Sequence, residues 1–525
     1  MIRDINFGYA ALLLIPGLLL TFSLSRIVRQ FFYNRNVKAA GGVHAPSSSN
    51  NSITPDNTEV LKFILETADA LKKNKLLENF NTSIDKYGTV SCPNCIEMNL
   101  TGDQRNILTR EPEHVKAVLT GKFADYGKGA EFHDLWSPFL GDSIFTTDGK
   151  QWSNSRNLIR PMFAKNRVSD LDIFERRTKI MLGLFPPAGE TFDLMNLFYR
   201  LTIDITTEFL LGQSINSLEY PKGDFVDAFE EVQRIQMLLT TIGPFHHFYP
   251  RRAYKRGIKV IDNFVLPFVR KALELPEEEL QKLSRSERSF TFLHSLALFT
   301  RDPKVIRDQI VSVLLAGRDT TASTLSWTFY ELANYPKVYA KLRAEVLATL
   351  GEDGRPTYDD LKRMKYLRNT INETLRLYPA VPFNVRSALA DTTLPTGGGP
   401  HGDLPITVLK NDVVIYSTLA MQRRRDLYPP VSDTFADPAI FSPERWESWQ
   451  PKPWTYVPFN GGPRICIGQN FALAEIAYVV ARMAQKYERM EYAGNWAGQE
   501  YRTEIVGCPD QGVPVRFFEA GSKAQ

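Results

Sequence analysis

The amino-acid sequence predicts a mainly α-helical protein with a small β component, preceded by one N-terminal transmembrane helix. Helical periodicity dominates from residue 58 onward, strand-like runs such as 412–417 and 512–518 are short, and the uncharged apolar run Phe7–Ser25 precedes both. At 525 residues and 43% hydrophobic content, the chain is long enough to bury a prosthetic group. Its net charge of +4 is too small for its size to indicate nucleic-acid binding.

The run Phe7–Ser25 has a length near the minimum for a helix that crosses a bilayer. Its central Pro16-Gly17 fits a membrane helix, because such helices tolerate kinks. Basic residues follow from Arg26 on, whereas Arg3 and Asp4 cancel before the run, which predicts a cytoplasmic position for the rest of the chain. A cleaved signal peptide and a mitochondrial presequence fit less well, since no small-residue cleavage site is evident and the run is neither amphipathic nor rich in arginine.

Three segments are therefore expected. Residues 1–30 form the membrane anchor, and residues 31–57 form a polar linker that contains a stretch rich in Ser, Asn and Pro. Residues 58–525 form one helical domain, in which no internal repeat and no second domain boundary are visible.

Four cysteines are too few for a disulfide framework, which suits a reducing compartment. Cys92-Pro-Asn-Cys95 is a single C-x-x-C. Zinc would need two more ligands, and Cys466 and Cys508 lie far away in sequence. A redox role would need a βαβ context, which is not visible. We therefore expect a surface loop at this motif.

The segment 397–402 (GGGPHG) matches the G-x-G-x-x-G pattern of nucleotide-binding loops. Such a loop must join a strand to a helix. Here Pro400 lies inside the segment and an extended run, Leu404–Ser417, follows it. The segment therefore predicts a β-turn or hairpin loop and no nucleotide site.

The stretch Phe459–Gly468 (FNGGPRICIG) places Cys466 among glycines, directly before a helical pattern over Gln469–Lys486. Free backbone N–H groups and the positive end of the helix dipole should lower the pKa of this thiol and favour a thiolate. A thiolate there is a nucleophile or a metal ligand. The glycines let backbone approach a large flat group, and Arg464 can pair with an anionic substituent on it, which favours the ligand.

A long helix is predicted from Pro303 to Tyr335, with Asp302 as its N-cap. At helical rise its roughly 30 residues cover about 45 Å, enough to cross a whole domain. The middle segment 316–321 (AGRDTT) combines a glycine, which helices disfavour, with an acid and two hydroxyls in apolar surroundings.

Together these patterns resemble the cytochrome P450 family. FNGGPRICIG matches the haem-binding signature F-x-x-G-x-R-x-C-x-G at every fixed position, and AGRDTT is similar to the A-G-x-[DE]-T-T segment of the oxygen-binding helix. Residues 373–376 match the E-x-x-R helix, 152–156 match W-x-x-x-R, and 441–446 (FSPERW) resemble the P-E-R-F segment with a Trp in place of Phe. The motifs follow the family's order from about residue 125 to 510.

The resemblance implies a cytochrome P450 fold and a role for each matching residue. Cys466 would be the axial thiolate on the iron of haem b, a ligation that favours O–O bond cleavage. Thr320 would stabilise reduced, bound oxygen by a hydrogen bond, and Asp319 would supply protons. The other residues that the resemblance implies are Arg464, Trp152, Arg156 and Arg386 at the haem propionates, Phe459 and Gly468 around the sulfur, Ala316 beside the oxygen site, and the structural network Glu373–Arg376–Arg445.

The implied reaction inserts one oxygen atom from O2 into a C–H bond of a lipophilic substrate and uses two electrons. A separate NADPH–cytochrome P450 reductase is expected to supply them, because no flavin domain follows the cysteine helix; the basic run Arg423–Arg425 is one candidate docking face for it. The expected location is the endoplasmic reticulum membrane, with a single-pass anchor and a cytosolic catalytic domain.

The segments 140–156 and 316–322 look like the fungal branch that hydroxylates n-alkanes and fatty acids at or near the chain end. Such substrates need a long apolar channel, for which the candidate lining residues are Phe132, Leu135, Trp136, Leu314, Val381, Phe383, Val385 and Val506.

Three alternatives remain open at this point. One is pathway-specific oxidation of a polyketide or terpenoid intermediate in secondary metabolism. A non-catalytic haem-binding protein would not need the pair Asp319–Thr320. A cysteine hydrolase would need a histidine base, and none of the seven histidines lies in a recognisable partner motif.

Overall fold

The computed structural model describes residues 7–47, 57–99, 104–164, 171–284 and 290–521. The chain forms two compact units, and neither is one continuous stretch of sequence. The first unit combines Met1–Gly129 with Phe383–Ser417, and the second combines Ala130–Pro382 with Thr418–Gln525.

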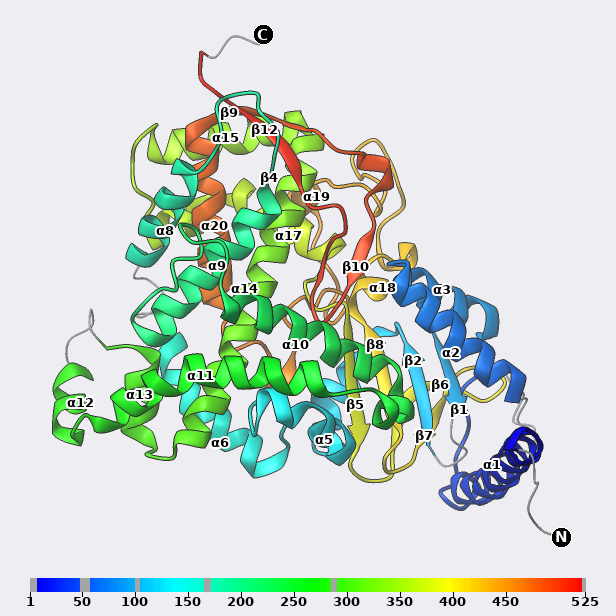
Figure 1. Ribbon diagram of the computed structural model, residues 1–525. Coiled ribbons are helices and arrows are strands. Elements are labelled where there is room, and N and C mark those ends of the chain that lie inside the picture. Colours follow the sequence, from blue (N-terminus) through cyan, green and yellow to red (C-terminus); the bar gives the residue numbers. More distant parts are fainter. Residues whose placement is uncertain (1–6, 48–56, 100–103, 165–170, 285–289, 522–525) are drawn as a thin grey trace. The chain divides into compact units, whose positions relative to one another are not determined.

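The first unit is built on a five-stranded sheet with the strand order β1-β2-β8-β5-β3 (Figure 1). β2 and β8 are parallel, and the other neighbours are antiparallel. β6 and β7 form a separate antiparallel pair, so the predicted hairpin at 397–402 is confirmed. The elements of this unit are α1 (Phe7–Ala39), α2 (Asn57–Lys72), α3 (Leu76–Tyr87), β1 (Cys95–Asn99), β2 (Arg105–Thr109), α4 (Pro112–Lys116), β3 (Tyr126–Gly127), β5 (Phe383–Ala388), β6 (Thr392–Gly398), β7 (Leu404–Val408) and β8 (Val413–Ser417).

A cluster of buried charged residues connects α1 to this sheet. The guanidinium of Arg105 donates to Glu97 Oε2 at 2.5 Å and to Asp412 Oδ2 at 3.1 Å, and the hydroxyl of Tyr33 on α1 donates to the same Asp412 oxygen at 2.5 Å. Pairing is required here, because an isolated buried charge is costly. The backbone bridge between Val43 and Ile406 adds a second attachment just after α1.

Residues 7–30 of the predicted anchor form part of α1, whereas residues 1–6 and the side chains of residues 7–20 lie outside the described part of the structure. Among the described residues, no helix combines the length and the apolar character that crossing a membrane requires. Part of the predicted linker, residues 48–56, also lies outside the described residues.

The second unit is mainly helical and is organised around α14 (Pro303–Asn334), which runs through the middle of the other helices (Figure 1). Asp302 caps it by accepting from the backbone N–H groups of Lys304 and Val305, as predicted. The helices α9 (Leu194–Leu211), α11 (Arg252–Glu274), α17 (Lys365–Leu377) and α20 (Gln469–Lys486) pack against it.

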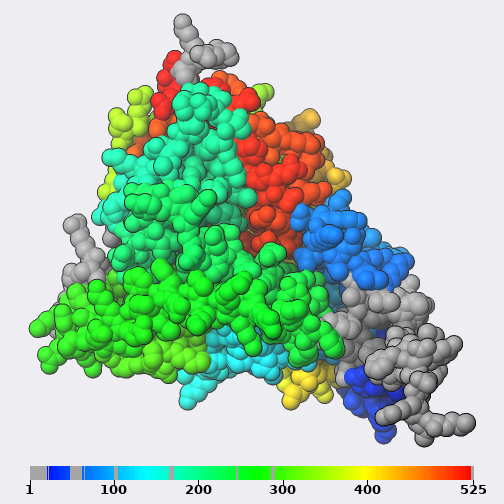
Figure 2. Space-filling view, viewed as in Figure 1, coloured from blue at the N-terminus to red at the C-terminus, as the bar shows by residue number. Residues whose placement is uncertain are grey.

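The remaining helices of the second unit cover this centre; on the face shown in Figure 2, residues of α10 and α11 form much of the surface. Its strands form the sheets β4-β12-β9 and β10-β11, which include the second of the two predicted strand runs. These elements are α5 (Gly129–Leu140), α6 (Gly149–Ile159), α8 (Asp172–Gly183), β4 (Phe192–Asp193), α10 (Asp224–Thr241), α12 (Glu277–Ser284), α13 (Phe292–Phe299), α15 (Pro336–Leu350), α16 (Tyr358–Arg363), α18 (Thr418–Gln422), α19 (Arg445–Ser448), β9 (Tyr487–Tyr492), β10 (Tyr501–Thr503), β11 (Gly507–Pro509) and β12 (Pro514–Glu519).

Candidate functional site

The segment before α20 is a tight loop that presents Cys466. The backbone N–H of Cys466 donates to Phe459 O at 3.0 Å and closes the loop. Gly462 lies in the left-handed region with a φ of 63°, which a residue with a Cβ rarely adopts. Gly461 is required for a different reason, because a Cβ there would lie 2.5 Å from the Trp454 ring. The glycines thus serve the local backbone and its packing in the structure.

Three effects act on the Cys466 thiol. Burial raises the pKa, while the backbone N–H of Gly468 and the positive charge of Arg156 lower it, and the net direction is upward. The sequence-based expectation of a lowered pKa is therefore wrong for the polypeptide by itself, because desolvation outweighs the helix start. The side chain nevertheless remains accessible, so the sulfur is surrounded by protein and still open to a ligand.

Arg464, Trp152 and Arg156 gather near this loop. The guanidinium of Arg464 donates to Asp148 Oδ1 at 2.6 Å and to Thr147 O at 2.9 Å, and it lies over the Trp152 ring at 4.7 Å. Arg156, one helical turn after Trp152 on α6, is 5.9 Å from the same ring. Two guanidinium groups therefore lie beside one indole, which is a setting suited to an anionic partner.

Only a few residues near the middle of α14 are accessible. Of residues 306–333, only Ala316, Gly317 and Thr320 are not fully buried. Thr320 Oγ1 donates to Ala316 O at 2.7 Å. A Cβ on Gly317 would lie 2.8 Å from Thr206 Oγ1 of α9, so this glycine permits close contact between the two helices. The small residue Ala316 and the hydroxyl of Thr320 remain available to a bound group.

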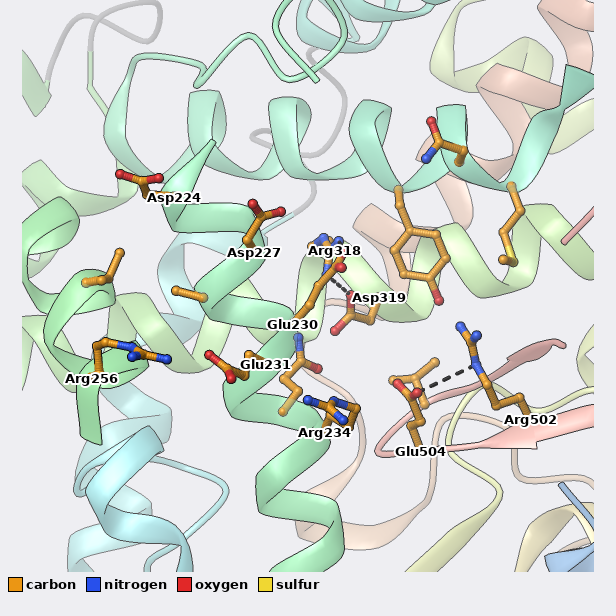
Figure 3. Close-up of a pocket in the computed structure, with 18 of the residues that line it drawn as sticks. Asp224, Asp227, Glu230, Glu231, Arg234, Arg256, Arg318, Asp319, Arg502 and Glu504 are labelled. Atoms are coloured by element: carbon orange, nitrogen blue, oxygen red, sulfur yellow. Dashed lines mark hydrogen bonds and ion pairs between the residues drawn. The ribbon is translucent and has the colours of Figure 1, made fainter. Parts of the chain in front are cut away.

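Asp319 is buried beside a charged hollow of about 760 Å³ (Figure 3). Arg318 donates to Asp319 Oδ1 at 2.9 Å through one guanidinium nitrogen and pairs with Glu230 of α10 through the other. Burial raises the pKa of the Asp319 carboxyl to about 6, although Arg318 and a hydrogen bond from Gln233 lower it. The hollow therefore connects the exposed Glu230 with a buried acid that titrates near neutral pH.

Other side chains around the hollow are also charged, and Figure 3 shows them pointing into it from several elements. Arg502 Nε lies 3.6 Å from Glu504 Oε1. The remaining charged residues that line the hollow are Asp193, Asp224, Asp227, Glu231, Arg234 and Arg256.

The structure brings the predicted Glu373–Arg376–Arg445 network together. Two guanidinium nitrogens of Arg376 donate to the Glu373 carboxylate at 2.8 Å, and Arg445 Nε donates to it at 3.3 Å. All three side chains are fully buried. The indole N–H of Trp446 adds a donor at 2.9 Å to Glu373 Oε2. The replacement of Phe by Trp in this segment thus supplies a hydrogen bond that Phe cannot make.

Arg386 belongs to the first unit, where it lies on β5. It is buried, donates to Val385 O at 2.8 Å and lies 6.0 Å from the Tyr416 ring.

The residues of the second unit fit a thiolate-bound haem. The accessible Cys466 sulfur supplies a ligand, Arg464 and Arg156 supply positive charge for anionic substituents, and α14 keeps a small residue and a hydroxyl accessible. Together with the mainly helical fold, these features define a haem-thiolate protein.

Comparison with known proteins gives the same class. The cytochrome P450 profile matches residues 68–501. A cytochrome P450 monooxygenase, pvhE, from Talaromyces variabilis is 48% identical over 439 residues, 79% of this chain and 81% of that protein. Cytochrome P450 52A1 from Candida tropicalis is 41% identical over 410 residues, 74% of each protein. The crystal structure of the cytochrome P450DA heme domain has a TM-score of 0.67 at 19% identity, covering 91% of this chain and 96% of that one, which shows the fold.

The chain belongs to the cytochrome P450 family. It is accordingly a monooxygenase that uses haem b, receives electrons from a redox partner and acts on a lipophilic substrate. Sequence reasoning named Asp319 but missed Gln233, which donates to it, and Glu230, which pairs with Arg318, because nothing in the sequence of α10 distinguishes them from ordinary polar residues of a surface helix.

Proposed function

We propose that this monooxygenase hydroxylates a fatty acid, an alkane or a similar aliphatic chain at or near its end. The observation that carries this proposal is the extended similarity to Candida cytochromes P450 of the 52 group, at 37–42% identity and up to 93% of the chain. The segments 140–156 and 316–322 resemble the fungal branch with that activity, as described above.

In this proposal Cys466 would bind the haem iron, and Arg464, Trp152 and Arg156 would hold the propionates. When bound, the haem supplies the activation of O2. Phe459 and Gly468 form the backbone loop and helix start that position the sulfur.

Asp319 and Thr320 on α14 would deliver protons and hydrogen bonds to the reaction. Because the pKa of Asp319 is about 6, its carboxyl oxygens can both take up and release a proton near neutral pH. Thr320 Oγ1, which here donates to Ala316 O, would be the hydrogen-bond donor at the accessible face of α14, where the haem would supply the activation of O2. Glu373, Arg376 and Arg445 would act structurally, since their buried network involves no accessible group.

An aliphatic chain needs apolar contacts, and α5 supplies several. Phe132 and Trp136 stack at 5.2 Å with nearly parallel rings, and Leu135 packs in the same apolar cluster. Val506, another predicted lining residue, borders the charged hollow at Asp319 instead. We propose the α5 side chains as the better supported part of the channel.

The finer cellular assignment is also a proposal. The apolar run Phe7–Ser25 followed by basic residues supports a single-pass anchor in the endoplasmic reticulum with a cytosolic catalytic domain. NADPH–cytochrome P450 reductase is the proposed electron donor. Of the run Arg423–Arg425, Arg423 donates to Leu377 O, Arg424 pairs with Asp426 and Arg425 pairs with Asp437. Arg425 is the most exposed of the ion-paired members, at 76%, and is the one that a partner could reach.

A second candidate is pathway-specific oxidation of a polyketide or terpenoid intermediate. The observation that favours it is the 48% identity to the monooxygenase pvhE, which does not carry a 52-group name.

A spectral titration separates the two. The full-length haem protein in detergent is first checked for the thiolate signature of its reduced CO complex and then titrated with fatty acids, alkanes and terpenoids. A low-to-high-spin shift that tightens with chain length supports the aliphatic substrate. A normal CO signature without response to any fatty chain supports the pathway-specific substrate, and a folded, haem-loaded protein without the thiolate signature contradicts the role of Cys466.

Thr320→Ala tests the proton assignment. The variant should bind haem normally but release peroxide instead of hydroxylated product, because the hydroxyl donor proposed for the accessible face of α14 would be gone. Coupled turnover equal to that of the unmodified protein would show that Thr320 has no such role.

A further inference from the structure

The C-x-x-C motif of the first unit lies at a surface turn, as predicted, because Pro93 is exposed and Asn94 is half-buried, but both of its cysteines are buried, which was not predicted. Cys92 is 4% exposed and Cys95 is 1% exposed. Pro93 and Asn94 form the turn between them, and Cys95 begins β1. The backbone N–H of Cys92 donates to Thr89 O and Oγ1 at 3.1 Å, which fixes the entry to the turn. Sequence patterning missed the burial because the covering residues come from distant parts of the chain.

The two sulfurs lie in one hydrogen-bonded arrangement. The Cys92 thiol donates to Cys95 O at 3.5 Å, and the nearby Cys95 thiol and the backbone N–H groups of Asn94 and Cys95 lower its pKa. A β-turn brings the Cα atoms of its first and fourth residues within about 7 Å, and disulfides span a similar range. The turn is also held from outside, since Arg110 N donates to Asn94 O at 2.9 Å.

The sulfurs differ in acidity. The hydrogen bond from Cys95 lowers the pKa of Cys92, against the effect of burial. The same hydrogen bond, together with burial, raises the pKa of Cys95 well above its usual value. Glu97 and Glu111 are the carboxylates that oppose ionisation, Glu111 at both thiols and Glu97 at Cys95. Cys92 is therefore the thiol that more readily becomes the nucleophilic thiolate.

A glycine-rich hairpin covers the motif and borders a hollow. A Cβ on Gly397 would lie 2.8 Å from the Cys92 sulfur, and one on Gly402 would lie 1.9 Å from Ser91 O. The hollow, of about 890 Å³, is lined by residues on both sides of this contact, including Thr89, Ser91 and Gly397. Cys92 itself does not line this hollow and is 4% exposed, so a reagent must pass the contact at Gly397 to reach its sulfur, which excludes a protein and favours a molecule as small as a peroxide.

We propose that Cys92 and Cys95 form a dithiol that hydrogen peroxide oxidises to a disulfide, with Cys92 as the attacking sulfur and Cys95 as the resolving one. The Cys92 thiolate attacks one peroxide oxygen, the O–O bond breaks, and the other oxygen leaves as water after taking up a proton. The Cys95 sulfur then attacks the resulting sulfenic acid, the S–O bond breaks, and a second water leaves. The two sulfurs lose two electrons, and the peroxide is reduced to two molecules of water.

Peptide mapping of the full-length haem protein tests this proposal. Trypsin cuts after Lys86 and Arg105, so one peptide, Tyr87–Arg105, carries both cysteines and neither of the others. After brief peroxide treatment and alkylation of free thiols, this peptide should be unalkylated and lighter by two hydrogen atoms, and dithiothreitol should restore alkylation. The Soret absorbance is followed to confirm that the protein stays folded and loaded.

Cys508 serves as the internal control, because it is also buried and burial raises the pKa of its thiol to about 11. We expect the Cys92–Cys95 pair to oxidise at least about tenfold faster than Cys508. In Cys95→Ser, dimedone added together with denaturant, so that its size does not limit access, should trap a sulfenic acid on Cys92, whereas Cys92→Ser should leave Cys95 unmodified. Oxidation of Cys508 at the same rate, or absence of the sulfenic acid in Cys95→Ser, overturns the proposal. Neither outcome depends on the substrate of the monooxygenase.

Discussion

Replacing Arg318 with Gln should raise the pKa of Asp319 and move the pH dependence of the enzyme. Arg318 is 3% exposed, and its guanidinium donates to Asp319 Oδ1 at 2.9 Å. Among the described residues, Arg318 is the one cation that forms an ion pair with the Asp319 carboxyl. Arg318→Gln removes this cation. The hydrogen bond from Gln233 remains.

The size of the shift follows from the contact. A cation at hydrogen-bonding distance lowers a carboxyl pKa by about 1–3 units, so removing Arg318 should raise the pKa of Asp319 from about 6 to about 7–9. At about 1.4 kcal/mol per unit, this equals about 1.4–4 kcal/mol, comparable with the cost of breaking a buried ion pair. At pH 7 the ionised fraction should fall from about nine tenths to about one half or less.

The pKa of Asp319 also determines whether the stability of the protein rises or falls with pH. The pKa of Asp319 in the folded protein lies above its usual value of 3.8, so its contribution to stability is complete below pH 4 and is lost as the pH rises through about 6. In Arg318→Gln this loss should continue to higher pH. Infrared titration of the carboxyl band that disappears in Asp319→Asn measures the pKa directly, and the ratio of product to NADPH consumed as a function of pH measures its effect on turnover.

Arg234→Gln is the matched control, because Arg234 lines the same hollow and the substitution removes the same charge. Arg318→Lys, which keeps a cation, should restore part of the shift. A carboxyl midpoint in Arg318→Gln that stays near 6, or an equal shift in Arg234→Gln, would refute the reasoning that the direct pair sets this pKa.

Three further changes have outcomes that the packing determines. Glu475 on α20 is fully buried, its carboxyl oxygens have no hydrogen-bond partner among the described residues, and burial raises its pKa well above 4.5. Its contribution to stability should therefore be lost as the pH rises above 4.5, and urea unfolding at pH 5 and 8 should show a smaller decrease in stability for Glu475→Gln than for the wild type. Trp446→Phe deletes the donor to buried Glu373 and should lower the free energy of unfolding by about 1–3 kcal/mol. Gly317→Ala should lower the melting temperature through contact with Thr206, and Thr206→Ala should restore it.

Local signals in the sequence predicted the helices that carry the site. Asp302 and Pro303 are a cap and a first-turn residue, and the structure begins α14 at Pro303. The cysteine helix α20 begins and ends at the predicted residues, Gln469 and Lys486. Such boundaries are predictable because capping and apolar periodicity depend on a few neighbouring residues.

The division into two units was not predictable in this way. The first unit joins Met1–Gly129 to Phe383–Ser417, and β2 pairs with β8 across about three hundred residues of sequence. Pairing at that separation depends on the whole fold. The buried state of Cys92 has the same origin, since Gly397 covers its sulfur from the later segment.

At the candidate site, the sequence identifies the functional residues but does not predict the neighbours that surround them. The resemblance singled out Asp319 and Thr320, but the titration of the acid depends on Arg318 and Glu230, and neither belongs to the fixed positions of the A-G-x-[DE]-T-T pattern. Cys466 is a comparable case: the helix start acts in the expected direction, yet burial dominates its pKa. A motif therefore identifies the group that can react, whereas the pH at which it reacts follows from neighbours that only the folded structure brings to it. Substitutions at those neighbours, more than at the motif itself, should change the pH dependence without abolishing the activity.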